Sequence, residues 1–547
     1  MAYGQSSYAR TCIDNSCDRR HIFLVTGLLM MLGGTNRFCD KSEGGEREEN
    51  TKIMTKSRGV RLLRRTMLVF FGILIYLMST TPPASAIPVF ARKYGTSCST
   101  CHNNFPELND FGWAFYKNGF KFPKDDETFV KEPPVLLGAK AQKEAFPGAI
   151  FPGEIPGTVP IGLRYEGYAH FNSKQPPSLG VLPRVDLFAP NTFTILTAGS
   201  FGPTLSWWVD DDISVGGQNA AGGMGFGYLK ANDIGHYLHL PKDTLNVRFG
   251  QFELDLPFSQ AYTINPTDYD IYDEVAVAGA LGTTNNPFSF AAMQRGIEFG
   301  GYPNDGNFNW SVAITDGSNN NTPCCVQSFA NGTGTAEVAN GKNIFVNVFQ
   351  QFNLERDPAV RKEVQAAGPT GPHDHTSIRL GAFYDYGTNR FNLNLTDFPG
   401  FPVFNEPFYR VGGYFRFRYQ SKFELYGMGM FAHDSNLIPT ALPAGNAVLA
   451  GPSINYSGGF AEAEYWLFPW VVPIMRYDLV NSPFDFAAGL SQGTSRNRFS
   501  PGVQVLVRAN IKVNFEYEHR WGVPVPGAVV PTLFHPNGAL LGMDFAF

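Results

Sequence analysis

The strongest constraint on the fold is a two-residue alternation of polar and apolar side chains that recurs from residue 161 onward. In YRVGGYFRFRYQ, one face of an extended strand would carry Arg410, Tyr414, Arg416, Arg418 and Gln420, and the other Val411, Phe415, Phe417 and Tyr419. In IKVNFEYEHRW, Lys512, Asn514, Glu516 and Glu518 oppose Ile511, Val513, Phe515 and Tyr517. Successive side chains of a strand point to opposite faces, so the pattern predicts strands of about ten residues between two unlike environments.

Composition favours a membrane as one of those environments. Aromatic residues make up 14% of the chain and charged residues only 17%, and no apolar run after residue 87 reaches the 18 residues of a membrane helix. Tryptophans near predicted strand ends resemble interfacial girdles: Trp207, Trp208, Trp466, Trp470 and Trp521. Roughly sixteen strands fit between Ile161 and Phe547, so we predict a mainly β fold, a transmembrane barrel of about 16 antiparallel strands.

Two segments resemble parts of outer-membrane barrels. The chain ends in LLGMDFAF, where Leu541, Met543, Phe545 and Phe547 alternate, as in the insertion signal of bacterial outer-membrane proteins. The segment Val247–Ser259, VRFGQFELDLPFS, resembles a strand-and-turn unit of porins. A soluble sandwich would also alternate, but with shorter strands and a less aromatic apolar face. Apolar strands alternating with helices, as TIM barrels and Rossmann folds require, are missing.

The segment before the strands divides into four parts. Residues 54–86 combine a basic start, the apolar run MLVFFGILIYLM and the A-x-A site PASA, which predicts an export signal cleaved before Ile87. A short membrane anchor is the alternative reading. Residues 1–53, which hold Cys12, Cys17 and Cys39, fit a gene-model extension ahead of a natural start at Met54. Residues 87–122 form a small N-terminal domain, and the Pro- and Lys-rich residues 123–160 a linker to the barrel at 161–547.

The N-terminal domain carries one Cys-x-x-Cys-His motif, from Cys98 to His102. This spacing attaches c-type haem, with Cys98 and Cys101 as thioethers and His102 as the proximal iron ligand. A zinc site would need a second ligand pair, and a thioredoxin-like pair would need a βαβ unit. We therefore predict one covalent haem c.

A short helix can follow the motif, and Pro106 limits where it begins. An apolar surface is supplied by Phe105, Leu108, Phe111, Trp113 and Phe115, and Gly112 and Gly119 are predicted points of close approach or helix termination. No methionine lies between Ile87 and Gly223, so a local axial methionine is excluded. His170 is the tentative distal ligand, with an open or water-bound position as the alternative. The other histidines of the barrel region are His236, His239, His373, His375, His433, His519 and His535. A domain this small cannot bury a haem alone, so we expect it to plug the barrel lumen.

The stretch IPVFARKYGTSCSTCHNNFPELNDFGWAFYKNGFKF resembles the fused monohaem cytochrome–porins of iron-oxidising bacteria. The matching positions are Pro88, Phe90, Ala91, Arg92, Cys98, Cys101, His102, Phe105, Pro106, Leu108, Asn109, Phe111, Gly112, Gly119 and Phe120. The resemblance implies electron transfer across the outer membrane, oxidation of extracellular Fe(II), and a periplasmic electron carrier, a c-type cytochrome, as acceptor. The match covers about 36 residues.

The same sequence features fit two other functions. The haem domain could gate a transport porin, or the chain could be an exported haem peroxidase with an open iron position. The acidic runs Asp210–Asp212 and Asp268–Glu274 are expected to be solvated turns, with a cation-concentrating role as the alternative. Cys324 and Cys325 suit a strained disulfide better than a metal site. A net charge of −5 without a basic stripe excludes nucleic acid as a partner.

Overall fold

The computed structural model describes residues 89–122, 126–131, 135–136, 144–148, 154–155, 157, 160–172, 185–202, 204–215, 220–221, 224–259, 262–273, 293–303, 306–316, 342–355, 376–392, 403–420, 422–435, 453–481, 496–521 and 537–547. Within them, no helix is long and apolar enough to cross a membrane. The predicted export signal, residues 1–53 and the Cys324–Cys325 pair lie outside the described residues.

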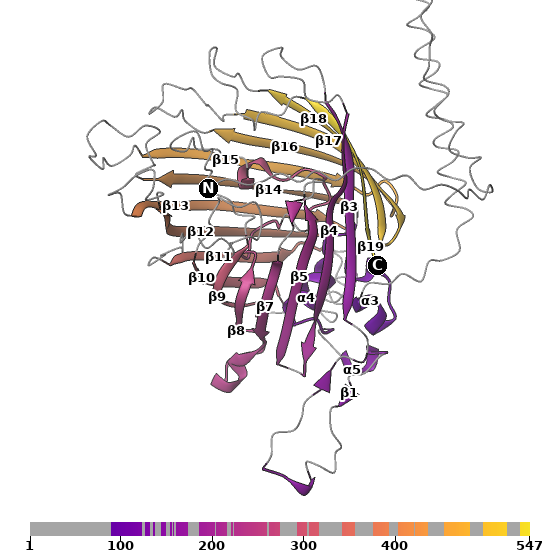
Figure 1. The fold of residues 1–547 in the computed structure, drawn as a ribbon, viewed down its shortest axis with the longest axis vertical. Helices are drawn as coiled ribbons and strands as arrows, with labels where there is room; N and C mark the ends of the chain where they lie inside the picture. Colours follow the sequence, from indigo (N-terminus) through magenta and orange to yellow (C-terminus); the bar gives the residue numbers. More distant parts are fainter. Residues whose placement is uncertain are drawn as a thin grey trace, which may run out of the picture. The chain divides into compact units, whose positions relative to one another are not determined.

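The described strands from residue 161 onward close into one antiparallel barrel, as Figure 1 shows. They are β3 (Ile161–Asn172), β4 (Val185–Phe201), β5 (Leu205–Val215), β7 (Met224–Ala231), β8 (Asn246–Phe252), β9 (Gln294–Gly301), β10 (Phe308–Thr315), β11 (Asn343–Asn353), β12 (Ser377–Asn392), β13 (Val403–Tyr419), β14 (Phe423–Asp434), β15 (Ile454–Tyr465), β16 (Val471–Asn481), β17 (Arg496–Arg508), β18 (Ile511–Trp521) and β19 (Gly538–Ala546). The two-residue β6 (Ala220–Ala221) pairs with β5 as β7 does and extends β7. Counted so, the barrel has the predicted sixteen strands.

The barrel closes where its last strand pairs with its first. β19 runs antiparallel to β3, with Gly538 opposite Asn172 and Ala546 opposite Arg164. The terminal Phe547 exchanges backbone hydrogen bonds of 2.7 and 2.8 Å with Leu163. The predicted first strand therefore begins at the expected residue, Ile161, and the alternating C-terminal segment seals the wall.

The two faces of each strand meet different surroundings, as the alternation predicts. On β16, Arg476 and Asp478 are fully buried in the lumen, whereas Met475, Tyr477 and Leu479 are 58%, 40% and 42% exposed on the outer face. Lumen-facing Arg410, Arg416 and Arg418 on β13 are buried in the same way. An apolar outer face around a charged lumen, without a free sheet edge, identifies an integral outer-membrane barrel.

The two ends of the barrel differ in the length of their connections. At one end, five of the seven connections hold two to six residues, for example 202–204 between β4 and β5 and 509–510 between β17 and β18. We call this the short-turn end. At the opposite end every connection holds ten or more residues, apart from the one between β5 and β7, which contains β6. Short turns face the periplasm in outer-membrane barrels, so the start of β3 and the end of β19 lie on the periplasmic side.

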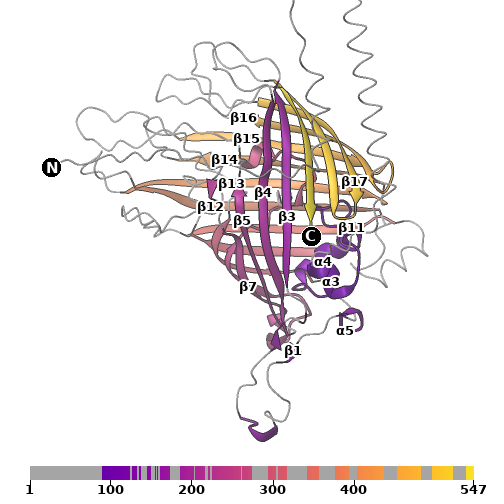
Figure 2. The same ribbon diagram turned by 45° about the vertical axis from the view of Figure 1, so that its right-hand side comes forward.

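Residues 89–122, which we call the plug, form a small helical unit at the short-turn end. It contains α3 (Val89–Tyr94), the 3₁₀ turn η1 (Cys98–Thr100) and α4 (Asp110–Lys117). Figures 1 and 2 both show α3 and α4 beside the C-terminal end of β19. The predicted linker has short elements of its own: α5 (Asp126–Phe129) and the paired β1 (Val135–Leu136) and β2 (Glu154–Ile155).

After β8, the chain leaves the wall and crosses the lumen. Residues 253–259 and 262–273, which we call the lumen loop, end in α7 (Asp270–Asp273), which lies against β15 and β16. Tyr269 stacks on Phe460 at 3.9 Å, and Phe258 on Tyr426 at 4.7 Å. The loop therefore packs an aromatic core inside the barrel.

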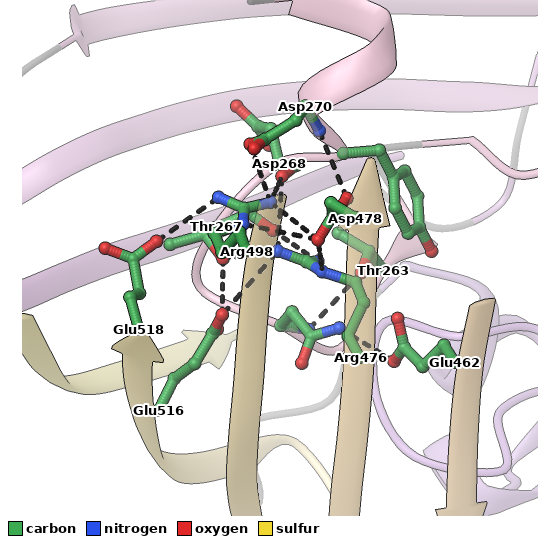
Figure 3. A network of polar contacts seen from close by, with 12 residues as sticks. Thr263, Thr267, Asp268, Asp270, Glu462, Arg476, Asp478, Arg498, Glu516 and Glu518 are labelled. Atoms are coloured by element: carbon green, nitrogen blue, oxygen red, sulfur yellow. Dashed lines mark hydrogen bonds and ion pairs between the residues drawn. The ribbon is translucent and has the colours of Figure 1, made fainter. Parts of the chain in front are cut away.

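Two arginines of the wall hold the lumen loop, as Figure 3 shows. Arg476 donates to the Thr267 carbonyl at 2.8 Å, and Arg498 pairs with Asp270 at 2.9 Å and with Asp478 at 3.1 Å. All four ionic side chains are almost fully buried. Removing one partner of such a network leaves a buried charge uncompensated, which costs about 3–5 kcal/mol.

Two sequence expectations about the barrel are wrong in detail. Trp208 faces the lumen, where its indole donates to Asp210 at 2.9 Å, and Trp466 packs against the lumen-loop residue Ile264. Neither belongs to an outer girdle. The run Asp210–Asp212 is not a turn but part of β5, and Asp270 of the second run is buried by Arg498. Asp210 and Asp212 accept hydrogen bonds from the neighbouring strands, from the Phe226 amide and the Thr194 hydroxyl, and Asp270 pairs with an arginine that is distant in sequence.

Candidate functional site

The Cys-x-x-Cys-His motif folds into a tight turn. The Cys101 amide donates to the Cys98 carbonyl at 3.1 Å and the His102 amide to the same carbonyl at 3.0 Å. This places both thiols and the imidazole on the wall of one cavity. Both thiols are free, and burial raises the pKa of Cys101 to about 12, so they are neutral at physiological pH.

A backbone carbonyl orients the His102 ring. Its Nδ1 lies 2.9 Å from the Pro106 oxygen, so in the neutral imidazole Nδ1–H donates and Nε2 keeps its lone pair. Burial lowers the pKa of His102 to about 4, which keeps the ring neutral. The arrangement is the one that metal-binding histidines use to fix their tautomer.

Helix α4 braces the motif from behind. Asn109 caps the helix by accepting from the Gly112 amide at 2.8 Å, and its Nδ2 donates to the Thr100 carbonyl at 3.1 Å. A side chain at Gly112 would place Cβ 2.1 Å from the Cys101 oxygen. Gly119, at φ +68, ends the helix. The predicted helix and both predicted glycine roles are present in the described plug.

The cavity of about 370 Å³ has two unlike walls. The plug contributes an aromatic wall, in which Phe90 contacts Phe115 at 5.0 Å and Phe120 at 5.1 Å. The barrel contributes a charged wall, which includes Glu166, Asp210, Asp212, Asp544, Arg164 and Lys512. Its volume lies within the range of about 300–1,000 Å³ typical of cofactor and ligand pockets.

These residues fit a covalent haem c. Two free thiols separated by two residues can form the thioethers, the adjacent imidazole presents Nε2, and the aromatic wall suits a porphyrin face. A structural metal site fits less well, because no three His, Cys, Asp or Glu side chains of the described segments are placed to hold an ion. Cys98, Cys101 and His102 are therefore the residues that would hold the group.

Partly buried ion pairs fasten the plug to the lumen face of the barrel and to the lumen loop. Lys117 pairs with Asp255 of the lumen loop at 2.8 Å, and Asp110 with Arg418 at 3.0 Å. Arg416 pairs with Glu107. The Phe105 carbonyl also accepts from Gln504 at 3.1 Å. The plug is thus bound through both polar and apolar contacts.

The charge of Lys117 keeps the carboxyl group of its lumen-loop partner, Asp255, ionised. Burial alone would raise the pKa of Asp255, but the adjacent Lys117 ammonium and the hydrogen bonds from Lys117 and Asn309 lower it below its ordinary range. Lys117 has its pKa raised by the same carboxylate, against the effect of burial. Both groups are charged near neutral pH.

The structure places the predicted distal ligand apart from the cavity. His170 faces the lumen from β3, two residues beyond Tyr168, which lines the cavity while His170 does not. Among the histidines in the described ranges, only His102 lines it. His236 and His239 lie in the turn between β7 and β8, and His433 and His519 on β14 and β18.

The barrel half of the site was missed from the sequence. Arg164, whose guanidinium lies 5.5 Å over the Phe105 ring, and Lys512 share Asp544 at 2.8 and 3.3 Å. Alternation alone indicates that these side chains face the lumen. Which lumen-facing residues meet the plug depends on the pairing of β3, β18 and β19, which local sequence does not reveal.

Comparisons with known proteins extend only to the fold. No family model matches the chain, and no curated protein matches it. Among solved structures, it is similar to the outer membrane channel DcaP of Acinetobacter baumannii (12% identity, 71% of this chain and 96% of that chain, TM-score 0.41). It is also similar to Salmonella typhi OmpF in complex with daunomycin (12%, 71% and 97%, 0.42) and to OmpT of Vibrio cholerae (8%, 76% and 100%, 0.41). At these identities the likeness says nothing about ligand or activity.

Proposed function

We propose that the chain is a monohaem cytochrome fused to an outer-membrane barrel, which moves electrons across the outer membrane. The observation that carries this proposal is the placement of Cys98, Cys101 and the Nε2 side of His102 around one cavity. Covalent haem c supplies one-electron chemistry between its ferric and ferrous states. The resemblance of residues 87–122 to cytochrome–porins adds extracellular Fe(II) as donor and a periplasmic c-type cytochrome as acceptor.

The chain's own residues would supply orientation and exclusion of water. The Pro106 carbonyl keeps the imidazole in one tautomer, and Asn109 and Gly112 hold α4 against the motif. Aromatic residues of the plug cover one side of the cavity, and barrel strands cover the other. The location of the plug at the short-turn end suits delivery of electrons to a periplasmic carrier.

The test is the absorption spectrum of the purified chain, recorded before and after anaerobic addition of Fe(II) in a stopped-flow instrument. Appearance of the ferrous c-type spectrum within the mixing experiment supports the proposal. A chain that carries haem and stays ferric with Fe(II), but not with dithionite, would contradict iron as donor.

A second candidate is a solute channel, favoured by the closed sixteen-strand barrel and its charged lumen. The plug and the lumen loop both occupy that lumen, held by the partly buried Lys117–Asp255 pair and the buried Arg498–Asp270 pair, which favours electron transfer. Solute uptake into liposomes by a chain that lacks haem would support the channel. Peroxide turnover would instead support the peroxidase reading.

A further inference from the structure

Four glutamates meet where the plug contacts β13, β14 and β15. Glu424 on β14 lies directly opposite Glu464 on β15, and Tyr426 opposite Glu462. Glu107 of the plug reaches the same place through Arg416. Glu424, Glu462 and Glu464 are fully buried, and Glu107 is 6% exposed. Like charges directly across a ladder repel each other, so this arrangement needs compensation.

The available arginines compensate only part of the cluster. Arg416 pairs with Glu107 and Glu424, and Arg418 pairs with Glu424 at 2.8 Å. No ion pair in the described barrel reaches Glu462 or Glu464. Glu462 accepts from the Asn265 amide at 2.7 Å and Glu464 from the Tyr426 hydroxyl at 3.1 Å, and both donors are neutral.

Three of these four glutamates each have one carboxyl oxygen without a hydrogen-bond partner among the described residues: Glu107 Oε2, Glu462 Oε2 and Glu464 Oε2. An ionised carboxylate that is buried with one neutral donor carries a penalty of several kcal/mol. Either a cation or a proton must offset it. Because no three acidic, His or Cys side chains of the described segments are placed to hold a metal ion, the geometry favours a proton.

We propose that Glu462 and Glu464 form a proton-binding site in the lumen, which holds at least one proton at neutral pH and faces Glu107 of the plug. A protonated carboxyl becomes a donor as well as an acceptor, so the proton removes a charge and supplies a missing hydrogen bond. The site is independent of haem and of the proposed electron transfer.

Charged and titratable groups face this site from every neighbouring element. They are Glu107 on the plug, Arg416 on β13, Glu424 and Tyr426 on β14, Tyr269 on the lumen loop, Arg476 on β16 and Glu516 on β18. Loss of the proton adds a negative charge opposite Glu107. Docking of the plug is therefore expected to weaken as the pH rises through the titration of the site.

Infrared spectroscopy of the full-length protein in detergent tests the proposal. The C=O stretching band of a protonated carboxyl group is separated from the bands of ionised carboxylates. The intensity of this band is compared at pH 7 in the parent chain and in the variants Glu462→Gln, Glu464→Gln and Asp211→Asn. Glutamine has the shape of the protonated acid, so both variants should fold, and Asp211 is an exposed control on the outer face of β5. Heat-modifiable migration on gels reports folding.

The expected result is a protonated-carboxyl band that at least one glutamate variant removes and the Asp211 variant keeps. In parallel, the protection of residues 89–122 from hydrogen exchange should fall with rising pH in the parent chain, and less in Glu464→Gln. Absence of the band at pH 7, or a band that neither variant changes, overturns the proposal. So does a bound metal, found by elemental analysis, that both glutamate variants lose.

Discussion

Gly112→Ala is the sharpest test of how the plug is built. In a helix, Ala is ordinarily more stable than Gly by about 1 kcal/mol. Here the new Cβ would lie 2.1 Å from the Cys101 oxygen and 3.0 Å from Leu108 Cδ2. The first contact is about 1 Å too short, and overpacking of this kind costs about 1–3 kcal/mol. Because the obstacle is backbone of the Cys-x-x-Cys-His turn, we expect a net loss of about 1 kcal/mol or more.

The assay is hydrogen exchange of residues 89–122 in the folded barrel, read by mass spectrometry, because local opening reports local stability. A loss of about 1.4 kcal/mol lowers the protection of the plug about tenfold, while the barrel strands keep theirs. Gly148→Ala is the matched control, since nothing lies within 4 Å of its new Cβ. If Gly112→Ala keeps the protection of the parent chain, α4 does not brace the motif as described.

The remaining predictions concern other contacts of the plug and the lumen loop. Because the pKa of Asp255 is lowered in the folded protein, its ion pair with Lys117 stabilises the docked plug at pH values above the unfolded pKa of about 3.9. This stabilisation is lost as the pH falls through the folded pKa, so protection of the plug from protease should drop in acid. Asp255→Asn should abolish that drop, and an unchanged drop in the variant would refute the role of the pair. Arg498→Met should release the lumen loop and raise single-channel conductance, because the loop loses the ion pair that holds it to the wall. The control Lys422→Met, at an exposed position, should leave the conductance unchanged. Equal conductances in the two variants would contradict the role of Arg498. Asn109→Ala should destabilise α4 by about 1 kcal/mol, seen as faster exchange in the plug; unchanged exchange would exclude the cap.

The barrel was predictable because a strand with lipid on one side and a polar lumen on the other alternates apolar and polar residues along the sequence. Glu516 and Glu518 face the lumen as the alternation requires, and the first strand begins at Ile161. The same rule explains the error over the acidic run: Asp211 points outward while Asp210 and Asp212 line the cavity.

The local contacts of the plug could be predicted from the sequence, whereas its partners on the barrel and the lumen loop could not. Asn109, Gly112 and Gly119 act within a few residues of the motif, where spacing carries the information. The partners Arg416 and Asp255 are far away in sequence. Their meeting with the plug depends on barrel closure and on the path of the lumen loop, which no local pattern encodes.

Covalent haem on Cys98 and Cys101 is the central claim, and the most direct measurement is made on the denatured chain. The protein is expressed with a c-type haem maturation system, purified, denatured and examined by intact mass and by absorption. We predict one haem per chain that remains attached after denaturation and is lost in the Cys98→Ala, Cys101→Ala double variant. A folded barrel without attached haem, with both thiols free to alkylation, would contradict it.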